Sequence, residues 1–361
     1  MMTAPNPPMQ TRTLPYGAVA IAEAAALIRA GQPVAIPSET VYGLAADATD
    51  SGAVARIYAA KGRPSFNPLI VHVLDLAAAE RIAVFDSTAR ALAEVFWPGP
   101  LTLVLPVRPD AGIASLVTAG LDTIAIRVPA HRAMRALIAA AGVPLAAPSA
   151  NASGAISPTR AAHVVASLGG RIALVVDDGA TEAGVESTIV AGVQVLRPGP
   201  VTAEDLARFG EDSPAPPLHF PGEGRGPGEG DVQVGATLSS DLATPRPRPS
   251  PGKRVKEEEE EREAAIGTAP GQLASHYAPN KPLRLNATEA GTDEYLIGFG
   301  DVAGDTSLSA HGDLTEAAAN LFDALHRADG SDRARIAIAP IPSDGIGTAI
   351  NDRLRRAAHR D

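Results

Sequence analysis

The sequence predicts an α/β protein with two domains. Short apolar stretches typical of β-strands alternate with amphipathic stretches typical of α-helices, and this order indicates helices packed against a sheet. The chain has 361 residues, enough for about two domains of ordinary size. Hydrophobic residues make up 45% of the chain but aromatic residues only 4%, so the cores must be built mainly from Ala, Val, Leu and Ile.

Each expected element follows from a local pattern. Apolar residues recur at helical spacing over 18–30, and Gly31 then ends this helix. A strand running into a polar turn is expected over 34–45, and a helix with Ser51 as its N-cap over 51–62. Further strands are expected over 68–74, 101–107, 123–128, 144–150, 172–179 and 187–199. Further helices are expected over 87–97, 131–142 and 159–170.

The chain divides into three segments. The α/β pattern covers residues 1–210, and a linker follows over 211–282. Much of that linker is a Pro/Gly-rich tract followed by a like-charge block, a composition that buries too little apolar surface to be fully ordered. Residues 283–361 repeat a β-α-β-α order, which predicts a smaller Rossmann-like domain. Because GxGxxG is missing there, the sequence does not support a dinucleotide site in this domain.

Composition also excludes several classes of function. The chain has no cysteine, which rules out disulfides, thiolate metal sites and a cysteine nucleophile, and suits a reducing cytosol. The N-terminal region has no apolar signal core, and no uncharged apolar stretch is long enough to cross a membrane. We therefore expect a soluble, cytoplasmic protein. A net charge of −10 argues against an extended nucleic-acid surface.

Two polar loops are candidate binding elements. The turn over 37–44 carries the hydroxyls of Ser38 and Thr40 around Glu39, although an ordinary turn with a capped helix start is the commoner explanation. Lys61 and Arg63 flank a glycine and suit a polyphosphate, with a solvated basic loop as an equal alternative.

Arg127 lies in the middle of an apolar strand, where an unpaired charge is costly. It therefore needs a buried anionic partner, either a protein carboxylate or a ligand carboxylate. Because no acidic residue follows Asp122 on that strand, the sequence favours the ligand. His72, flanked by valines, is by itself more typical of a core histidine than of a catalytic group.

The loop over 147–159 is rich in Ser, Asn and Gly, the ingredients of a backbone nest for phosphate. It is not a P-loop, because GxxxxGK[ST] is missing. Ser187 and Arg197 are expected at strand ends further along the chain, and each alone is a weak signal.

Seven motifs, taken in order, resemble those of the YrdC/Sua5 family of threonylcarbamoyl-AMP synthases: PSETVYGL, KGRP with NPLIVHV, WPGPLTLVLP, TIAIRVP, APSANASG, ESTIV and LRPG. The resemblance covers about residues 14–210 and continues with PGQLASHYAP at 270–279 and a C-terminal domain, as in the longer Sua5 type. It implies a twisted YrdC-like sheet with a large concave cavity.

The resemblance also implies the reaction. A nucleotidyltransferase of this family joins L-threonine, bicarbonate or CO2, and ATP into threonylcarbamoyl-AMP and releases pyrophosphate, with Mg2+ as cofactor. A downstream threonylcarbamoyl transferase complex then modifies adenosine 37 of tRNA. The implied partners are therefore the three substrates and that complex, with room for a weak RNA contact and no membrane.

Residue roles carry over by matching positions. The threonine site implied by the resemblance consists of Thr40, His72, Arg127, Ala147 and Ser187. The implied ATP site consists of Arg63, Asn67, Thr123, Ser149, Ser157, Arg197 and Tyr277, the last from a linker that closes as a lid. Lys61 and Arg63 would be catalytic through charge neutralisation, and no protein metal ligand is expected. Two features depart from the family pattern: Ser38 stands where Thr is usual, and the linker is long.

Two other classes of function were weighed. An RNA-binding or ribosome-associated module of the same fold is disfavoured by the acidic charge and the scarce aromatics. A hydrogenase-maturation carbamoyltransferase embeds a similar domain but carries Cys-rich zinc motifs, and this chain has no cysteine.

Overall fold

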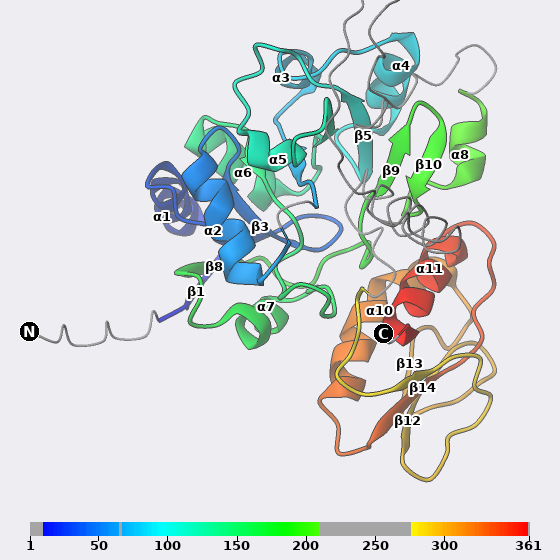
Figure 1. The fold of residues 1–361 in the computed structure, drawn as a ribbon. Helices are drawn as coiled ribbons and strands as arrows, with labels where there is room; N and C mark the ends of the chain where they lie inside the picture. The colour runs from blue at the N-terminus through cyan, green and yellow to red at the C-terminus, as the bar shows by residue number, and fades with distance from the viewer. Residues whose placement is uncertain (1–9, 65–66, 210–275, 360–361) are drawn as a thin grey trace, which may run out of the picture.

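A computed structural model describes residues 10–64, 67–209 and 276–359, which form a larger and a smaller α/β body (Figure 1). The larger body comes from the first two ranges and the smaller one from the third. The predicted fold class is confirmed for both. The expected linker lies mostly outside the described residues, so the three-part division of the chain stays a prediction.

The larger body is built from short elements. Its strands are β1 (Arg12–Pro15), β2 (Val34–Pro37), β3 (Tyr42–Asp47), β4 (Ile70–His72), β5 (Leu101–Pro106), β6 (Thr123–Arg127), β7 (Leu145–Ala146), β8 (Leu174–Asp177), β9 (Thr188–Ala191) and β10 (Gln194–Arg197). Its helices are α1 (Ala18–Arg29), α2 (Ser51–Lys61), α3 (Leu76–Glu80), α4 (Ser87–Phe96), α5 (Ser115–Thr118), α6 (Arg132–Ala141), α7 (Ala161–Leu168) and α8 (Ala203–Ala207).

The strands form one mixed sheet of ten strands in the order β1-β8-β2-β3-β7-β4-β6-β5-β9-β10. Strands β2 and β3 are antiparallel neighbours, so the polar turn that joins them lies at one end of this strand pair. Strands β4 and β6 run parallel, and their register places His72 opposite Arg127. The sheet thus brings together three segments on which the sequence analysis placed polar side chains.

Helices cover both faces of this sheet. On one face α1 and α6 pack Ile28 and Leu137 against Ile36 of β2. On the other face α2 and α4 pack Ile57 and Leu92 into a larger core. Small and aliphatic side chains dominate both cores, as the low aromatic content predicts. No helix in the described part of the chain is long and apolar enough to cross a bilayer.

The local predictions hold with four corrections. The segment 34–45, expected as one strand running into a turn, contains strand β2 and most of its antiparallel partner β3 on either side of the turn. The N-cap of α2 is Asp50 and not Ser51, because the Asp50 carboxylate accepts a hydrogen bond from the Gly52 N–H at 2.7 Å. The stretch 187–199 is two strands of a hairpin, β9 and β10, that reverses near Gly192. The strand expected over 144–150 is limited to β7, since the chain then leaves the sheet as a loop.

The smaller body is an open parallel sheet with two helices. Its strands are β11 (Leu283–Arg284), β12 (Glu294–Gly298), β13 (Thr306–Ser307) and β14 (Arg335–Ile338), in the order β11-β14-β12-β13. Helices α10 (Leu314–Asp329) and α11 (Gly347–Ala358) bury Leu321, Phe322 and Ile350 against it. The predicted Rossmann-like arrangement is confirmed, and the short strand β13 was not expected.

The two bodies pack through α10 and α11, which lie on the side of the smaller body that faces the larger one (Figure 1). Asp323 of α10 pairs with Arg160 at 2.8 Å, and His326 stacks on His163 with ring centroids 3.9 Å apart. At the closest approach, a Cβ built on Gly184 would lie only 2.3 Å from the backbone oxygen of Ala318. Glycine is required there by both contact and a φ of +68°.

We expect Gly184→Ala to destabilise the protein by about 2–4 kcal/mol, because the methyl group clashes with the backbone of α10 and the left-handed conformation is strained. Gly142→Ala is the matched control: its φ is +76° but its Cβ would meet nothing within 4 Å. It should lose only about 1 kcal/mol, the backbone cost alone. Urea unfolding of both variants measures the difference, and equal losses would contradict the predicted contact.

Candidate active site

A cavity opens where the larger body meets the first residues of the smaller one. It contains about 550 Å3 of empty space, a figure that includes the solvent at its open mouth. The residues that line it come from widely separated parts of the chain: Ser38, Thr40, Val41, Arg63, Ile70, His72, Arg127, Ala147, Pro148, Ser149, Glu186, Ser187, Arg197, His276 and Tyr277.

The turn between β2 and β3 forms one side of the cavity. The Ser38 and Thr40 hydroxyls lie 2.9 Å apart within it. Between them, the Glu39 carboxylate accepts hydrogen bonds from the backbone N–H groups of Ala130 at 3.0 Å and His131 at 3.3 Å. The turn therefore joins two antiparallel strands and is tied to the segment after β6, and it does not begin a helix.

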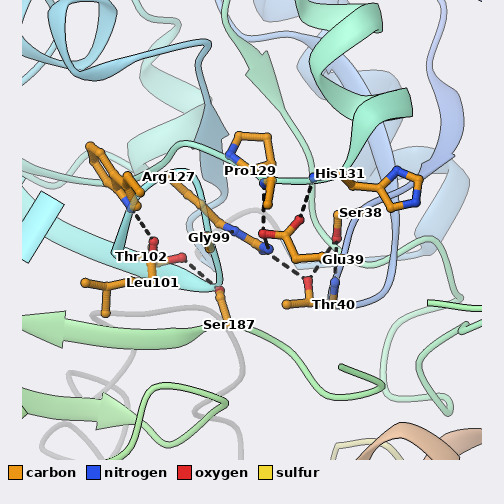
Figure 2. Close-up of polar contacts among 12 residues, drawn as sticks. Ser38, Glu39, Thr40, Gly99, Leu101, Thr102, Arg127, Pro129, His131 and Ser187 are labelled. Carbon is orange, nitrogen blue, oxygen red and sulfur yellow. Dashed lines mark hydrogen bonds and ion pairs between the residues drawn. The ribbon is translucent and has the colours of Figure 1, made fainter. Parts of the chain in front are cut away.

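Arg127, at the end of β6, is held by three contacts (Figure 2). Its Nη2 forms an ion pair with Glu39 Oε1 at 2.7 Å, its Nε donates to the Gly99 carbonyl at 3.0 Å, and its Nη1 donates to Thr40 Oγ1 at 3.0 Å. The sequence reasoning favoured a ligand carboxylate as the anionic partner. The structure shows a protein carboxylate, Glu39 of the turn between β2 and β3, in contact with Arg127, and the contact with a ligand carboxylate stays a prediction.

The ion pair fixes the charge state of Glu39. Burial alone would raise the pKa of this carboxyl, but the Arg127 guanidinium and the Ala130 N–H outweigh burial and lower the pKa to about 2. Arg127 Nη2 contacts Glu39 as an ion pair but makes no well-aligned hydrogen bond within the described residues. It therefore keeps hydrogen-bonding capacity that a second carboxylate could use.

His72 lies beside Arg127 in the sheet and lines the cavity. Burial, reinforced by the Arg127 charge, lowers its pKa to about 3, so the imidazole is neutral near pH 7. Its Nδ1 is buried and has no hydrogen-bond partner among the residues described. A buried unsatisfied nitrogen on a cavity wall is a position where a bound ligand can complete a hydrogen bond.

Lys61 is the last residue of α2, and Arg63 follows after Gly62, which adopts the left-handed conformation. Lys61 Nζ donates to the carbonyls of Ser149 and Asn151 and lies behind the cavity wall. Arg63 lines the cavity and donates to the Pro68 carbonyl at 3.1 Å. Burial lowers the pKa of Lys61 well below its usual value and that of Arg63 to about 10. An incoming anion would offset that burial cost.

The opposite wall carries Ser187 and Arg197. The Arg197 guanidinium donates to the Ser187 carbonyl at 2.9 Å and to its hydroxyl at 3.1 Å. The Ser187 hydroxyl also lies 2.8 Å from that of Thr102 (Figure 2). Burial lowers the pKa of Arg197 as well. This wall therefore presents a fixed arginine next to a hydroxyl whose neighbours are already in place.

His276 and Tyr277 contribute to the wall from the start of the smaller body. Tyr277 is 1% exposed, and its ring packs on Phe322 with centroids 5.7 Å apart. The next residue, Ala278, donates its N–H to the Gly154 carbonyl at 2.8 Å, which ties this segment to the loop after β7. Tyr277 thus lines the cavity and packs on the second domain at once. The preceding residues, 270–275, lie outside the described residues, so closure of this segment as a lid stays a prediction.

The structure brings nine of the expected site residues to the cavity and leaves four out of its lining. Those that line it are Thr40, Arg63, His72, Arg127, Ala147, Ser149, Ser187, Arg197 and Tyr277. Lys61 lies behind the wall, as described, and Ser157 is buried with its hydroxyl donating to Glu186. The Asn67 carbonyl accepts from the Tyr58 hydroxyl at 2.9 Å. Thr123 begins β6, so it lies about 13 Å along the strand from Arg127.

Comparison with known proteins agrees with this architecture. A family model described as telomere recombination, covering Sua5, YciO and YrdC, matches residues 26–199, and the model of the threonylcarbamoyl-AMP synthase C-terminal domain matches residues 249–359. A threonylcarbamoyl-AMP synthase of Bacillus subtilis is 37% identical, over 94% of this chain and 92% of its own. The chain belongs to the threonylcarbamoyl-AMP synthase family.

Two further comparisons concern an archaeal member of the threonylcarbamoyl-AMP synthase family. The Pyrococcus abyssi threonylcarbamoyl-AMP synthase is 36% identical over 93% of each chain. The crystal structure of P. abyssi Sua5 complexed with L-threonine matches with a TM-score of 0.75 and 33% identity, over 96% of this chain and 97% of that one. The match spans both bodies, so the pairing of the two domains is shared with that family member.

Sequence reasoning missed three groups that line this cavity. Glu39 lies in the expected 37–44 turn without an assigned role, although an acidic residue in a polar turn is a candidate partner for an arginine in an apolar strand. Glu186 lay in a recognised motif, yet only the adjacent serine was assigned. His276 had no signal beyond its place in the HYAP segment.

The pKa of Glu39 makes acid stability testable. A carboxyl whose folded-state pKa lies below its unfolded value stabilises the fold above the unfolded value and loses that contribution as pH falls. For Glu39 the loss should span pH 4.5 to about 2 and amount to about 3 kcal/mol. We expect the Glu39→Gln variant to be less stable than the parent at neutral pH by about that amount. Its stability should lack the part of the fall at acid pH that comes from protonation of Glu39.

Glu94→Gln is the matched control, because Glu94 is exposed on α4. Urea unfolding of both variants and the parent across this pH range measures the effect. If Glu39→Gln and Glu94→Gln show the same acid dependence, Glu39 does not carry the proposed ion-pair energy.

Proposed function

We propose that this chain forms threonylcarbamoyl-AMP and pyrophosphate from L-threonine, bicarbonate or CO2, and ATP, and so acts in tRNA threonylcarbamoylation. One observation carries the proposal: among the described residues, five basic side chains are buried in and around the cavity against three carboxylates. The cations are Lys61, Arg63, Arg127, Arg197 and Arg353, and the carboxylates are Glu39, Glu186 and Asp352. A ligand with several negative charges restores the balance.

The threonine site in this proposal is the end of the cavity formed by β4, β6 and the 37–42 turn. Arg127 offers its remaining donors to the threonine carboxylate, since Glu39 and Gly99 hold the guanidinium in place. The neutral His72 offers its unpartnered Nδ1 to a polar group of threonine. Thr40, Ala147 and Ser187 surround the same space. The relative from P. abyssi was crystallised with L-threonine, which supports this assignment.

The ATP site in this proposal is the side formed by Arg63, Arg197, Ser149 and Tyr277. Arg63 and Arg197 face the triphosphate, and Tyr277 contacts the nucleotide from the second domain. Lys61 acts through the loop that it holds, or directly once ATP is bound. Asn67, Thr123 and Ser157 remain part of the proposed ATP site, although they are not among the residues that line the cavity.

The chemistry requires no protein nucleophile. The neutral threonine amine adds to CO2 and loses a proton to solvent to give an N-carboxylate, and an oxygen of that carboxylate attacks the α-phosphorus of ATP while pyrophosphate leaves. Negative charge develops on the bridging oxygen and the departing phosphates, and buried arginines that are already oriented stabilise it without reorganising. The three-contact hold on Arg127 keeps threonine oriented for this attack.

Mg2+ enters this scheme with the substrate. No group of three or more carboxylates or imidazoles within the described ranges could hold a metal ion. Glu186, the carboxylate among the lining residues, is already engaged by Ser157 and Arg353. These residues do not fit a resident metal site, whereas Mg2+ commonly binds through substrate phosphates and keeps several waters. We therefore assign Mg2+ to the nucleotide complex.

Two further parts of the proposal rest on the family. A threonylcarbamoyl transferase complex consumes the product downstream, and use of ATP agrees with a cytoplasmic location. The RNA-binding alternative is not favoured, because the relatives that match across both bodies are named as synthases. A weak RNA contact during transfer stays compatible with the proposal.

Replacing Arg127 tests the threonine site. Arg127→Ala should weaken threonine binding by about 2–5 kcal/mol, because the carboxylate loses a buried charged partner. Arg132→Ala is the matched control, since Arg132 is exposed and pairs with Asp178 away from the cavity. Calorimetric titration with threonine measures both. Normal threonine affinity in a folded Arg127→Ala variant would remove Arg127 from the site.

Replacing Lys61 or Arg63 tests the reaction itself. Each alanine variant should slow threonine-dependent pyrophosphate release at least about tenfold, which corresponds to about 1.4 kcal/mol of barrier. Arg56→Ala, on the same helix but bonded to the Gly31 carbonyl, should leave the rate unchanged. Product analysis with ATP, bicarbonate and each amino acid in turn identifies the adenylate. Absence of a threonine-dependent product from the parent protein would refute the proposed function.

A further inference from the structure

Glu186 is out of place in a cavity for a polyanion. It is 6% exposed and lines the same cavity as Arg63 and Arg197. Burial acts to raise its pKa, but Arg353 and Arg197 outweigh burial and lower it, so the carboxylate is ionised near neutral pH. An ionised carboxylate on this wall opposes the binding of a triphosphate unless another group neutralises it.

Arg353, on α11 of the smaller body, supplies that charge. Its Nε forms an ion pair with Glu186 Oε2 at 2.9 Å, while Ser157 donates to the other carboxylate oxygen. Arg353 is fully buried, and its Nη1 contacts Asp352 at 2.8 Å. The pair therefore joins two residues 167 positions apart in the chain and crosses from one body to the other.

Arg353 also supports a second wall residue. Its guanidinium lies over the Tyr277 ring, 5.3 Å from the ring centre, in a cation–π arrangement. Tyr277 and Glu186 both line the cavity, whereas Arg353 is not among the lining residues. Arg353 thus contacts two residues of the cavity wall without lining the cavity itself. Both contacts come from the second domain, to which Arg353 belongs.

We propose that Arg353 is a positioning residue for the nucleotide: it neutralises and orients Glu186 and supports Tyr277, so that the smaller body completes the ATP side of the cavity. This inference rests on the proposed function, since it assumes that the cavity takes ATP. In the alternative, Arg353 only clamps the two bodies together, in which case its loss affects stability and not the choice of ligand.

Calorimetric titrations of ATP and of threonine, performed separately at mildly alkaline pH to favour the ionised Glu186 carboxyl, distinguish these cases. Arg353→Met should weaken ATP binding about tenfold or more, because Glu186 then faces the triphosphate unpaired. Threonine binding should change less than about twofold, since the Arg127 end of the cavity is untouched. The double variant Glu186→Gln/Arg353→Met should regain most of the ATP affinity.

The matched control is Arg333→Met, because Arg333 is exposed and bonds within the smaller body to the Thr292 carbonyl. It should bind both ligands normally. The isosteric variant Glu186→Gln keeps a hydrogen-bond acceptor for Arg353, so it serves if Arg353→Met does not fold. It should bind ATP several-fold more tightly, because it removes a negative charge from the wall.

Three outcomes would overturn the inference: parallel losses of ATP and threonine affinity in Arg353→Met, no recovery in the double variant, or unchanged or weaker ATP binding in Glu186→Gln. A failure of the proposed function looks different. If the proposed function is wrong, the parent protein itself does not bind ATP. The variants then show no difference in ATP binding that could be attributed to Arg353.

Discussion

Burial of positive charge around one cavity is the constraint on which the rest of this structure depends. An arginine or lysine removed from water must be paired, hydrogen-bonded or neutralised by a ligand. The fold meets this requirement for Arg127 with Glu39 and for Arg353 with Glu186, and it gives Lys61 and Arg63 backbone carbonyls as partners. Backbone oxygens carry only partial charge, so these carbonyls solvate Lys61 and Arg63 without cancelling a full positive charge.

The mixed topology of the sheet makes this concentration of charge possible. The parallel pair β4 and β6 ends beside the antiparallel turn between β2 and β3, so polar side chains from separate segments reach the same space without long loops. The helices at the back are packed with alanine, valine and leucine, which hold the strands rigid. Rigid supports are what allow arginine side chains to be oriented before a ligand arrives.

Much of this could be predicted from the sequence, and the exceptions share a cause. Local patterns predicted nearly all longer elements, because the periodicity of a helix or strand is visible within a few neighbouring residues. The helix expected over 18–30 is an example. Pairings between distant segments were not predictable in this way. The partner of Arg127 was expected to be a protein carboxylate or a ligand carboxylate, with the ligand favoured, yet Glu39 lies 88 positions earlier and only the folded sheet brings it close. Asp50 replaced Ser51 as N-cap because both residue types suit that position.

Arg353 shows the same limit more strongly. In the sequence it is one of several charged residues on an amphipathic closing helix, and helical spacing from Ile350 to Ala357 places it on the apolar face without identifying its partner. Only its complete burial against the other body distinguishes it.

The core of the smaller body is not closed by its own residues. Val41, Ile156 and Val185 of the larger body belong to the same buried cluster as Phe322 and Leu354. During synthesis, these three side chains leave the ribosome long before α11 does, because the chain is made from its N-terminus. The larger body therefore keeps this apolar surface uncovered until α10 and α11 have been added, and the part of the cavity wall that Tyr277 supplies is completed after the rest.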